Sequence, residues 1–342
     1  MMAVQDKHRS MSVLSWLSWL YFGAVLGLWV VVYTLGDRWW PATVILFAPR
    51  WIAALPLAIL LPLAAWRSRF SLIPLLLGAL IVAGPVLGLN LSFGRSAALG
   101  GTILRVITCN IDGIKHDPVA LAVLIRDSSA DVVALQEYPA GLKLDLPPGW
   151  QSVQERGLAI LSRFPLQRGI TTLVSNPPNP WPSTCLLQCI VKTPGGDLNF
   201  CSLQLPTPRF DLLPLLDQTT VINPSRKGQL LAGTVYRRRA AQEVQKAVAG
   251  LSGPTIIAGD FNMPVESSIY RQVWNGYGNA FSQSGFGYGW TQRAKSRKLT
   301  SIGIRIDHIL IGPGLEVRDC TVGTDVGSDH LPLIADLEVV KR

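Results

Sequence analysis

The chain has 342 residues, a formal net charge of +9 and only 15% charged residues. Its mean hydropathy of +0.30 excludes a wholly water-soluble enzyme of ordinary composition, and its length allows one large domain or two ordinary ones. Seven of the 31 Lys and Arg residues and two of the 22 Asp and Glu residues lie in residues 1–100, which leaves 24 basic and 20 acidic residues in 101–342. We therefore expect a membrane-embedded N-terminal part and a mildly basic soluble domain.

The first apolar segment, residues 11–35, contains no charged side chain. A bilayer core is spanned by about 20 apolar residues in a helix. Lys7 and Arg9 precede the segment, as they would in a signal peptide, but the segment is longer than a signal-peptide core and further apolar segments follow it. We predict a transmembrane helix at about 12–35.

Two more apolar segments follow, at about 42–66 and 71–92. Pro49 and Arg50 interrupt the first of them, so it either spans the bilayer from an earlier start or is partly re-entrant. Tryptophans lie near the segment ends, as interfacial aromatic residues do, at positions 16, 19, 39, 40, 51 and 66. Residues 1–95 are therefore predicted to form a bundle of about three transmembrane helices, with the lipid bilayer as their partner.

Basic residues in the short flanks predict the orientation of these spans. One side has Lys7, Arg9, Arg67 and Arg69, and the other has Arg38, Arg50 and Arg95. The positive-inside rule then places the N-terminus in the cytoplasm. We expect an integral protein of a bacterial inner membrane whose soluble domain is extracytoplasmic. If the second segment does not cross, the domain lies on the cytoplasmic side instead.

Residues 96–102 are expected to be a linker, and 103–342 a soluble domain rich in strands. Strands are predicted at 103–108, 132–135, 158–161, 186–191, 198–203, 255–258, 304–311 and 331–339, and helices at 118–128 and 234–251. Many strands with few intervening helices favour a two-sheet α/β or α+β domain over a doubly wound fold.

Polar side chains follow the most apolar of these strands. Thr255–Ala258 is apolar or β-branched, and Asp260 and Asn262 come directly after Gly259. Residues i and i+2 of an extended segment point the same way, so a carboxylate and a carboxamide would project together. Such a pair suits phosphate-ester chemistry, although Asp, Asn, Gly and Pro also form ordinary turns.

Other predicted strands have polar residues at their ends as well. These are Asn110 with Asp112, Gln136 with Glu137, Asp307 with His308, and Asp329 with His330. Each alone would be a capped strand end. Together they predict one shared site, because each places its polar group where a buried strand reaches the surface.

The order of these blocks resembles the endonuclease/exonuclease/phosphatase superfamily. The matching blocks are Asn110, Gln136–Glu137, Gly259–Asn262, Asp307–His308 and Ser328–Pro332, and the resemblance covers about 103–340. It implies an α/β fold that is a four-layer α/β sandwich, with two packed mixed sheets flanked by helices and the site at one end. It also implies hydrolysis of phosphoric ester bonds.

The resemblance assigns roles to seven of the matching residues. Glu137 would be the main ligand of Mg²⁺ or Mn²⁺, supported by Asn110, and Asp329 would lie near the metal and the leaving group. Asp260 would orient or deprotonate the attacking water, and Asn262 would bind the phosphoryl group. His330 would donate a hydrogen bond to a phosphate oxygen, and Asp307 would fix its ring.

One departure from the family pattern affects the expected activity. Gln204 stands where many relatives have His, so the chain could instead be a tethered binding domain with weak turnover. The leading expectation is a membrane-anchored, metal-dependent phosphodiesterase of nuclease type that uses metal-assisted attack of water. The same residues would also serve a phospholipid or sphingolipid headgroup phosphodiesterase, or an inositol-phosphate-type phosphatase.

Two basic runs are candidates for contacts with phosphate. Residues 285–291 are similar to the Gly- and Trp-rich loop of the family. Arg293, Lys295, Arg297 and Lys298 are expected to bind substrate, because they lie between this block and Asp307, where relatives place a substrate-facing loop. Arg237–Arg239 is the second run, and a solvated helix end explains it equally well. The expected partners are thus a nucleic acid or a lipid headgroup; no protein partner is inferred.

Overall fold

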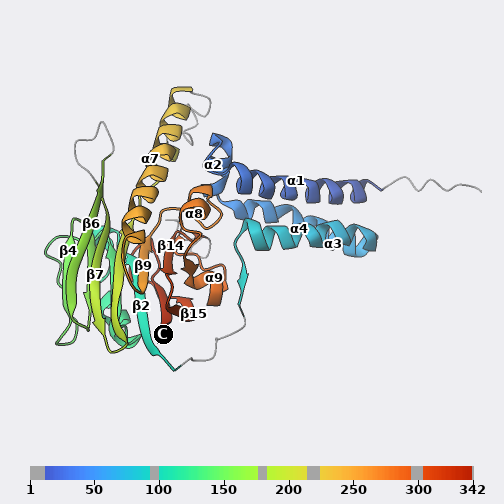
Figure 1. The fold of residues 1–342 in the computed structure, drawn as a ribbon. Helices are drawn as coiled ribbons and strands as arrows, with labels where there is room; N and C mark the ends of the chain where they lie inside the picture. The colour runs from blue at the N-terminus through green and yellow to red at the C-terminus, as the bar shows by residue number, and fades with distance from the viewer. Residues whose placement is uncertain (1–11, 93–99, 176–182, 214–223, 294–302, 341–342) are drawn as a thin grey trace, which may run out of the picture.

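The computed structural model describes residues 12–92, 100–175, 183–213, 224–293 and 303–340. Figure 1 shows N-terminal helices lying side by side and projecting from one side of a β-rich domain. The first part comprises α1 (Val13–Leu35), α2 (Trp40–Phe47), η1 (Arg50–Ala54), α3 (Leu55–Arg67), η2 (Arg69–Ser71), α4 (Leu72–Ile81) and the π-helical turn η3 (Val82–Val86).

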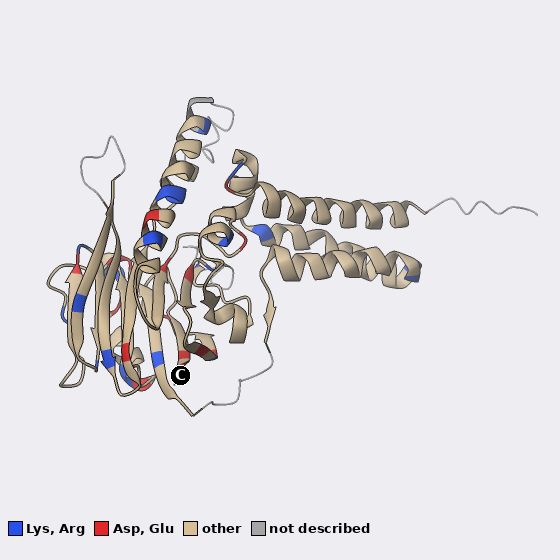
Figure 2. Ribbon diagram, in the orientation of Figure 1, with Lys and Arg blue, Asp and Glu red and all other residues tan. Residues whose placement is uncertain are grey.

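Three helical stretches are long and apolar enough to cross a membrane. They are Val13–Leu35, Arg50–Arg67 and Arg69–Val86, and Figure 2 shows charged residues only near their ends. The second stretch begins later than the expected 42–66. Ala48 is extended, with ψ 165°, because a residue before proline is disfavoured in the helical conformation. The break at Pro49 therefore makes α2 a separate short helix.

The remaining chain forms two mixed six-stranded sheets. The first has the order β15-β16-β2-β3-β5-β4, with bounds Leu315–Val322, Leu333–Val339, Thr102–Asn110, Val132–Gln136, Leu158–Ser162 and Gln151–Glu155. The second has the order β10-β14-β9-β8-β7-β6, with bounds Gly278–Asn279, Asp307–Ile311, Thr255–Asp260, Gly196–Gln204, Ser183–Thr193 and Leu166–Val174. In each sheet the central pair, β2/β3 or β8/β9, is parallel.

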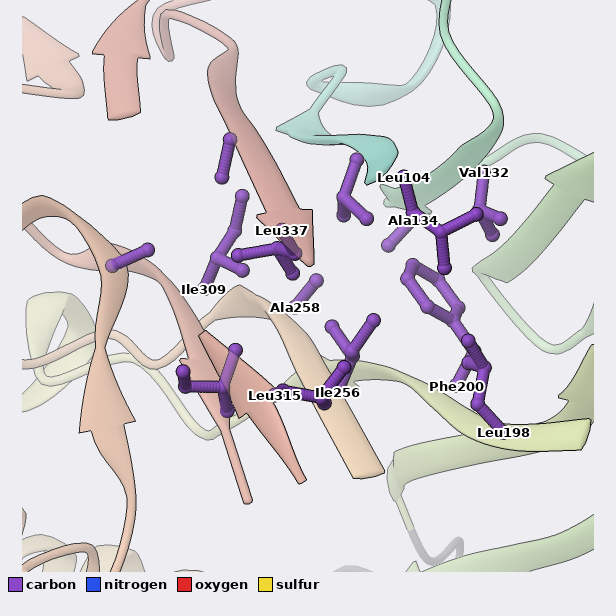
Figure 3. Packing of buried hydrophobic residues seen from close by; sticks show 14 of the residues in the cluster. Leu104, Val132, Ala134, Leu198, Phe200, Ile256, Ala258, Ile309, Leu315 and Leu337 are labelled. Carbon is purple, nitrogen blue, oxygen red and sulfur yellow. The ribbon is translucent and has the colours of Figure 1, made fainter. Parts of the chain in front are cut away.

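The sheets pack face to face and helices cover their outer faces. Leu104 and Ala134 of the first sheet meet Phe200 and Ala258 of the second in one buried cluster (Figure 3). Helix α5 (Pro118–Asp127) covers the first sheet, and α7 (Pro224–Ala249) and α8 (Ser268–Val273) cover the second. The predicted four-layer α/β sandwich is confirmed. Central strands such as β9 are buried on both faces, which explains their continuous apolar sequences.

The predicted strands lie mostly in the centre of each sheet, and the four strands at the sheet edges were missed: β4, β6, β10 and β15. Strand β10 has only two residues, too few to give a sequence pattern. Strands β4 and β6 are largely exposed, so their sequences lack an apolar run. Strand β15 alternates buried and charged residues at the other edge of the first sheet. Two further short pairs, β1 (Asn90–Leu91) with β11 (Phe286–Gly287) and β12 (Gln292–Arg293) with β13 (Gly303–Ile304), lie outside the main sheets.

Buried polar contacts join the N-terminal helices to the two-sheet domain. Asp37 Oδ2 accepts hydrogen bonds from Ser267 Oγ at 2.6 Å and Ser268 N at 3.0 Å. Asp37 Oδ1 also lies 3.7 Å from Arg237 Nη1, and both side chains are almost fully buried. Arg50 forms an ion pair with Glu266 at 3.4 Å. These contacts fix where the helical part meets the domain.

Candidate active site

The polar residues gather because of how the central strands are directed. The parallel strands β2 and β3 end at Asn110 and Gln136, and β8 and β9 end at Gln204 and Asp260. The carboxyl ends of parallel strands reach the same edge of a sheet. Antiparallel β14 begins there, with Asp307 opposite Asp260. One end of the sandwich thus collects the residues that the sequence predicted.

Gly259 allows β8 and β9 to approach closely at this end. A Cβ atom on Gly259 would lie 1.9 Å from the carbonyl oxygen of Leu203. Since that distance is impossible, only glycine fits between the strands. The close approach places Gln204 directly beside Asp260 in the sheet register.

Asn110 links two carboxylates from different sheets. Its Nδ2 donates to Glu137 Oε1 at 3.0 Å and to Asp260 Oδ2 at 3.1 Å. Gln204 Nε2 donates to the same Glu137 oxygen at 3.0 Å. Glu137 is exposed and has a left-handed backbone with φ 55°, a conformation that costs a non-glycine residue energy and is frequent at functional sites.

Asp260 is held from several directions. Its Oδ1 accepts the backbone N–H of Asn262 at 2.8 Å, and its Oδ2 accepts Asn262 Nδ2 at 3.0 Å. Burial raises the pKa of Asp260 to about 7, with a further contribution from the negative charge of Asp307. Asn262 Nδ2 also donates to the carbonyl oxygen of Leu205 at 2.8 Å, so both of its N–H groups are engaged. Asn262 therefore positions Asp260.

His330 and Asp307 form a buried pair beside Asp260. His330 Nδ1 donates to Asp307 Oδ2 at 2.8 Å. Burial alone would lower the pKa of His330, but the charge of Asp307 and this hydrogen bond raise it to about 10. The imidazole is consequently protonated at neutral pH, and Nε2–H is its second donor.

Two residues with no predicted role support this pair. Thr291 Oγ1 accepts the backbone N–H of Asp307 at 3.1 Å. Ser328 Oγ donates to the carbonyl oxygen of Asn110 at 2.7 Å and accepts the backbone N–H of His330 at 3.1 Å. Ser328 lies next to the Asp329–His330 motif, which was the available signal. Thr291 ends the block Gly285–Thr291, which is similar to a Gly- and Trp-rich loop of the family, but its contact with Asp307, 16 residues away, was not predicted.

His308 is not part of the cluster, although it follows Asp307 in sequence. Its Nε2 donates to the carbonyl oxygen of Met263 at 3.0 Å and its Nδ1 lies 3.2 Å from Asn279 Nδ2. Burial, assisted by the charge of Arg305, lowers the pKa of His308 to about 3. His308 is therefore a neutral core residue.

A cavity of about 550 Å³ opens over the cluster. Its lining includes every predicted catalytic or metal-binding residue except Asp307: Asn110, Glu137, Gln204, Asp260, Asn262, Asp329 and His330. Arg156 and Arg209 also line it and were not predicted. Neither belongs to a basic run, so the sequence offered no signal for them.

Of the basic residues that were predicted to bind substrate, the structure describes only Arg293. Arg293 pairs with Asp325 at 2.7 Å and its Nη2 donates to the carbonyl oxygen of Ser328 at 3.2 Å. It thus supports the loop that carries His330. Lys295, Arg297 and Lys298 lie outside the described residues.

The oxygen-rich part of the cluster fits a hard divalent cation better than the His-containing part. Ligand atoms of Asp260, Asp307 and His330 lie within 4.8 Å of one another. However, His330 is protonated and donates to Asp307, so it has no free lone pair at that nitrogen. Glu137 and Asp260 converge on one amide, and Glu137 forms no ion pair with a Lys or Arg among the described residues. Such carboxylate and amide groups suit Mg²⁺ or Mn²⁺.

Comparisons with known proteins agree with this architecture. The model of the endonuclease/exonuclease/phosphatase family matches residues 107–330. Family proteins of known structure from Bacteroides vulgatus and Bacteroides thetaiotaomicron are each 18% identical to the chain, with TM-scores of 0.51 and 0.50. The alignments cover 70% and 71% of this chain and 99% of each of those chains, which shows a shared DNase-like fold. No curated protein matches the sequence.

Proposed function

Since this chain belongs to the endonuclease/exonuclease/phosphatase family, whose members are hydrolases acting on phosphoester bonds, we propose that it is a membrane-anchored, metal-dependent phosphodiesterase. One observation carries the proposal. Glu137, Asp260 and His330 come from three separate parts of the sequence and line one cavity. Phosphoester hydrolysis requires three groups of this kind: a carboxylate that binds the cation, a carboxylate that accepts a proton from water, and a cationic hydrogen-bond donor.

Asp260 is the proposed acceptor for the attacking water. Its carboxylate is held by Asn110 and Asn262, so it is already oriented when substrate arrives. His330 is the proposed donor to a phosphoryl oxygen, with Asp307 fixing the ring through Nδ1. Asn262 contacts the phosphoryl group only if it releases Asp260 Oδ2, since both its N–H groups are engaged.

Glu137, with Asn110 and Asp329, is the proposed binding site for the divalent cation. When bound, Mg²⁺ or Mn²⁺ neutralises the phosphate and takes up negative charge on the leaving oxygen. Gln204 holds the Glu137 carboxylate through its amide, a task that needs no positive charge. We therefore favour an enzyme over a binding domain without turnover.

The N-terminal helices are the proposed membrane anchor. Residues 1–95 would form the transmembrane region, 96–102 the linker and 103–342 the catalytic domain, on the extracytoplasmic side of a bacterial inner membrane. The three apolar helical stretches and their basic flanks support this topology.

The leading expectation from the sequence is a nuclease-type enzyme, and its two basic runs are candidates for contacts with the phosphates of either a nucleic acid or a lipid headgroup. Arg237, at the start of one run, is buried against Asp37 and is not available to a polyanion. Most of the other run lies outside the described residues. The described basic side chains therefore do not favour nucleic acid over a lipid phosphodiester.

The full chain in detergent micelles tests the proposed function with bis(p-nitrophenyl) phosphate, a generic phosphodiester. We expect hydrolysis with Mg²⁺ or Mn²⁺ and none with a chelator. Asp260→Asn should lower kcat by about 10²- to 10⁴-fold, the usual contribution of a positioned acid or base. The control Asp197→Asn, at an exposed position at the start of β8, should leave kcat unchanged. Equal turnover by wild type and Asp260→Asn would remove Asp260 from the mechanism.

A further inference from the structure

A second cavity adjoins the catalytic one. It has a volume of about 380 Å³, and it shares three lining residues with the catalytic cavity: Arg209, Gln292 and Asp329. The shared lining residues place the two cavities next to each other, and the catalytic cavity is the one that His330 lines. We call this second cavity the junction groove.

The far wall of the junction groove comes from the membrane part of the chain. Phe47 ends α2, Trp51 lies in the first turn of the second apolar stretch, and Leu87 directly follows the third. Figure 1 shows these helix ends meeting the two-sheet domain. The groove therefore lies where the proposed spans leave the bilayer, the level at which tryptophan is favoured.

The groove combines apolar walls with cationic groups. Trp290 and Ile304 of the catalytic domain face the apolar residues of the helical part across it. Arg50 and Arg293 also line it. Each keeps a buried nitrogen, Nη1 of Arg50 and Nε of Arg293, that has no hydrogen-bond partner among the described residues. Buried donors of this kind are costly unless something accepts from them, so the groove favours a ligand that carries oxygen acceptors beside its apolar part.

We propose that the substrate is a membrane lipid with a phosphodiester headgroup, whose apolar chain enters the junction groove while its phosphorus lies over Asp260 and His330. This proposal rests on the proposed function and specifies its substrate class. The groove volume falls within the usual range for small-molecule sites, and its mixed lining matches an amphipathic ligand. A nucleic acid has no chain of this kind to bury there.

The reaction balances as a simple hydrolysis. The oxygen of water bonds to phosphorus, and one P–O ester bond breaks. One proton of the water passes to the departing alcohol and the other stays with the new phosphate monoester. No oxidant, reductant or second substrate is required.

The test compares an acylated and a deacylated substrate with the full chain in dodecyl maltoside micelles containing Mg²⁺. The probes are dioleoyl phosphatidylglycerol and glycerophosphoglycerol, with phosphate-monoester release followed by ³¹P NMR. We expect kcat/KM to be at least tenfold higher for the acylated probe. Ile304→Gln, which makes the groove polar, should bring the ratio of the two values close to 1 by raising KM for the lipid. Ile170→Gln, at a partly exposed position of edge strand β6, should leave the ratio unchanged.

Ala48→Phe fills the groove from its other wall and is the second variant, should Ile304→Gln fail to fold. Equal kcat/KM for both probes, or a ratio that neither groove variant changes, would overturn the lipid proposal. So would cleavage of DNA or RNA with the lipid left intact. Hydrolysis of bis(p-nitrophenyl) phosphate would in each case show that the proposed function stands, whereas its absence would overturn both proposals.

Discussion

The buried pair of Asp37 and Arg237 predicts a large loss of stability when one partner is removed. The side chains are 0% and 1% exposed, respectively, so neither charge is solvated. Removing one partner of such a pair costs about 3–5 kcal/mol, because the other charge remains buried. Arg237 Nη2 also donates to Thr234 Oγ1 at 2.9 Å, and the guanidinium carbon lies 5.4 Å from the ring centroid of Phe47. These remaining contacts favour the lower end of the range, about 3 kcal/mol.

Thermal unfolding of the full chain in detergent, followed by tryptophan fluorescence, measures this effect. A loss of about 3 kcal/mol corresponds to a fall in Tm of roughly 6–12 °C for a domain of this size. We expect such a fall for Asp37→Asn and for Arg237→Met. The double variant should lose less than the sum of the two, because it leaves neither charge unpaired. Arg239→Met, which removes an exposed i,i+4 pair with Glu243, should cost no more than about 0.5 kcal/mol.

The double variant also provides the refutation. If the double variant loses as much stability as the two single variants together, Asp37 and Arg237 do not interact. The helical part is then not fixed to the domain through this pair. An Asp37→Asn variant with the Tm of wild type would contradict the reasoning equally.

Three further predictions follow from individual residues. Glu137→Gln should abolish the rise in Tm that Mg²⁺ or Mn²⁺ gives the wild type, since a bound ion stabilises the folded state and the variant loses the carboxylate ligand. The same rise in Tm for the variant and the wild type would place the ion elsewhere. Gly259→Ala should lower the free energy of unfolding by several kcal/mol, or prevent folding, because its Cβ would meet a carbonyl oxygen of β8. The control Gly276→Ala, where a Cβ meets nothing within 4 Å, should be close to neutral in the same unfolding assay. The pKa of His308 is lowered to about 3, so the contribution of its neutral ring to stability is complete above pH 6.5 and is lost as the pH falls toward 3. His308→Asn should therefore flatten the dependence of Tm on pH between pH 6.5 and 3. If the variant and the wild type show the same dependence of Tm on pH, His308 is not the group responsible.

The predicted site residues illustrate what a sequence reveals about a cluster of this kind. Asn110, Gln204 and Asp260 each end a buried central strand, and such strands are recognisable because both faces are apolar. Once the parallel pairs are formed, their ends must meet. Local sequence therefore carried most of the information about this centre.

Other features depend on contacts between distant segments and were not predictable. Arg237 was interpreted as part of a basic surface, but Asp37, far away in the chain, supplies the charge that allows its burial. The junction groove likewise needs Trp51 and Trp290, which are far apart in the chain, to line the same cavity. No local pattern in either segment indicates the partner. Edge strands β4 and β6 were missed for a different reason, since an exposed strand has no need of apolar residues.

The position of a bound Mn²⁺ ion tests the central claim most directly, namely that Glu137 and its neighbours form a divalent-metal centre beside Asp260 and His330. Crystals of the full chain soaked in Mn²⁺ would locate the ion by its anomalous scattering. We predict a single strong peak next to the Glu137 carboxylate, inside the cavity that Asp260 and His330 line. A peak between Asp307 and His330, or no peak in this cavity, would contradict the account.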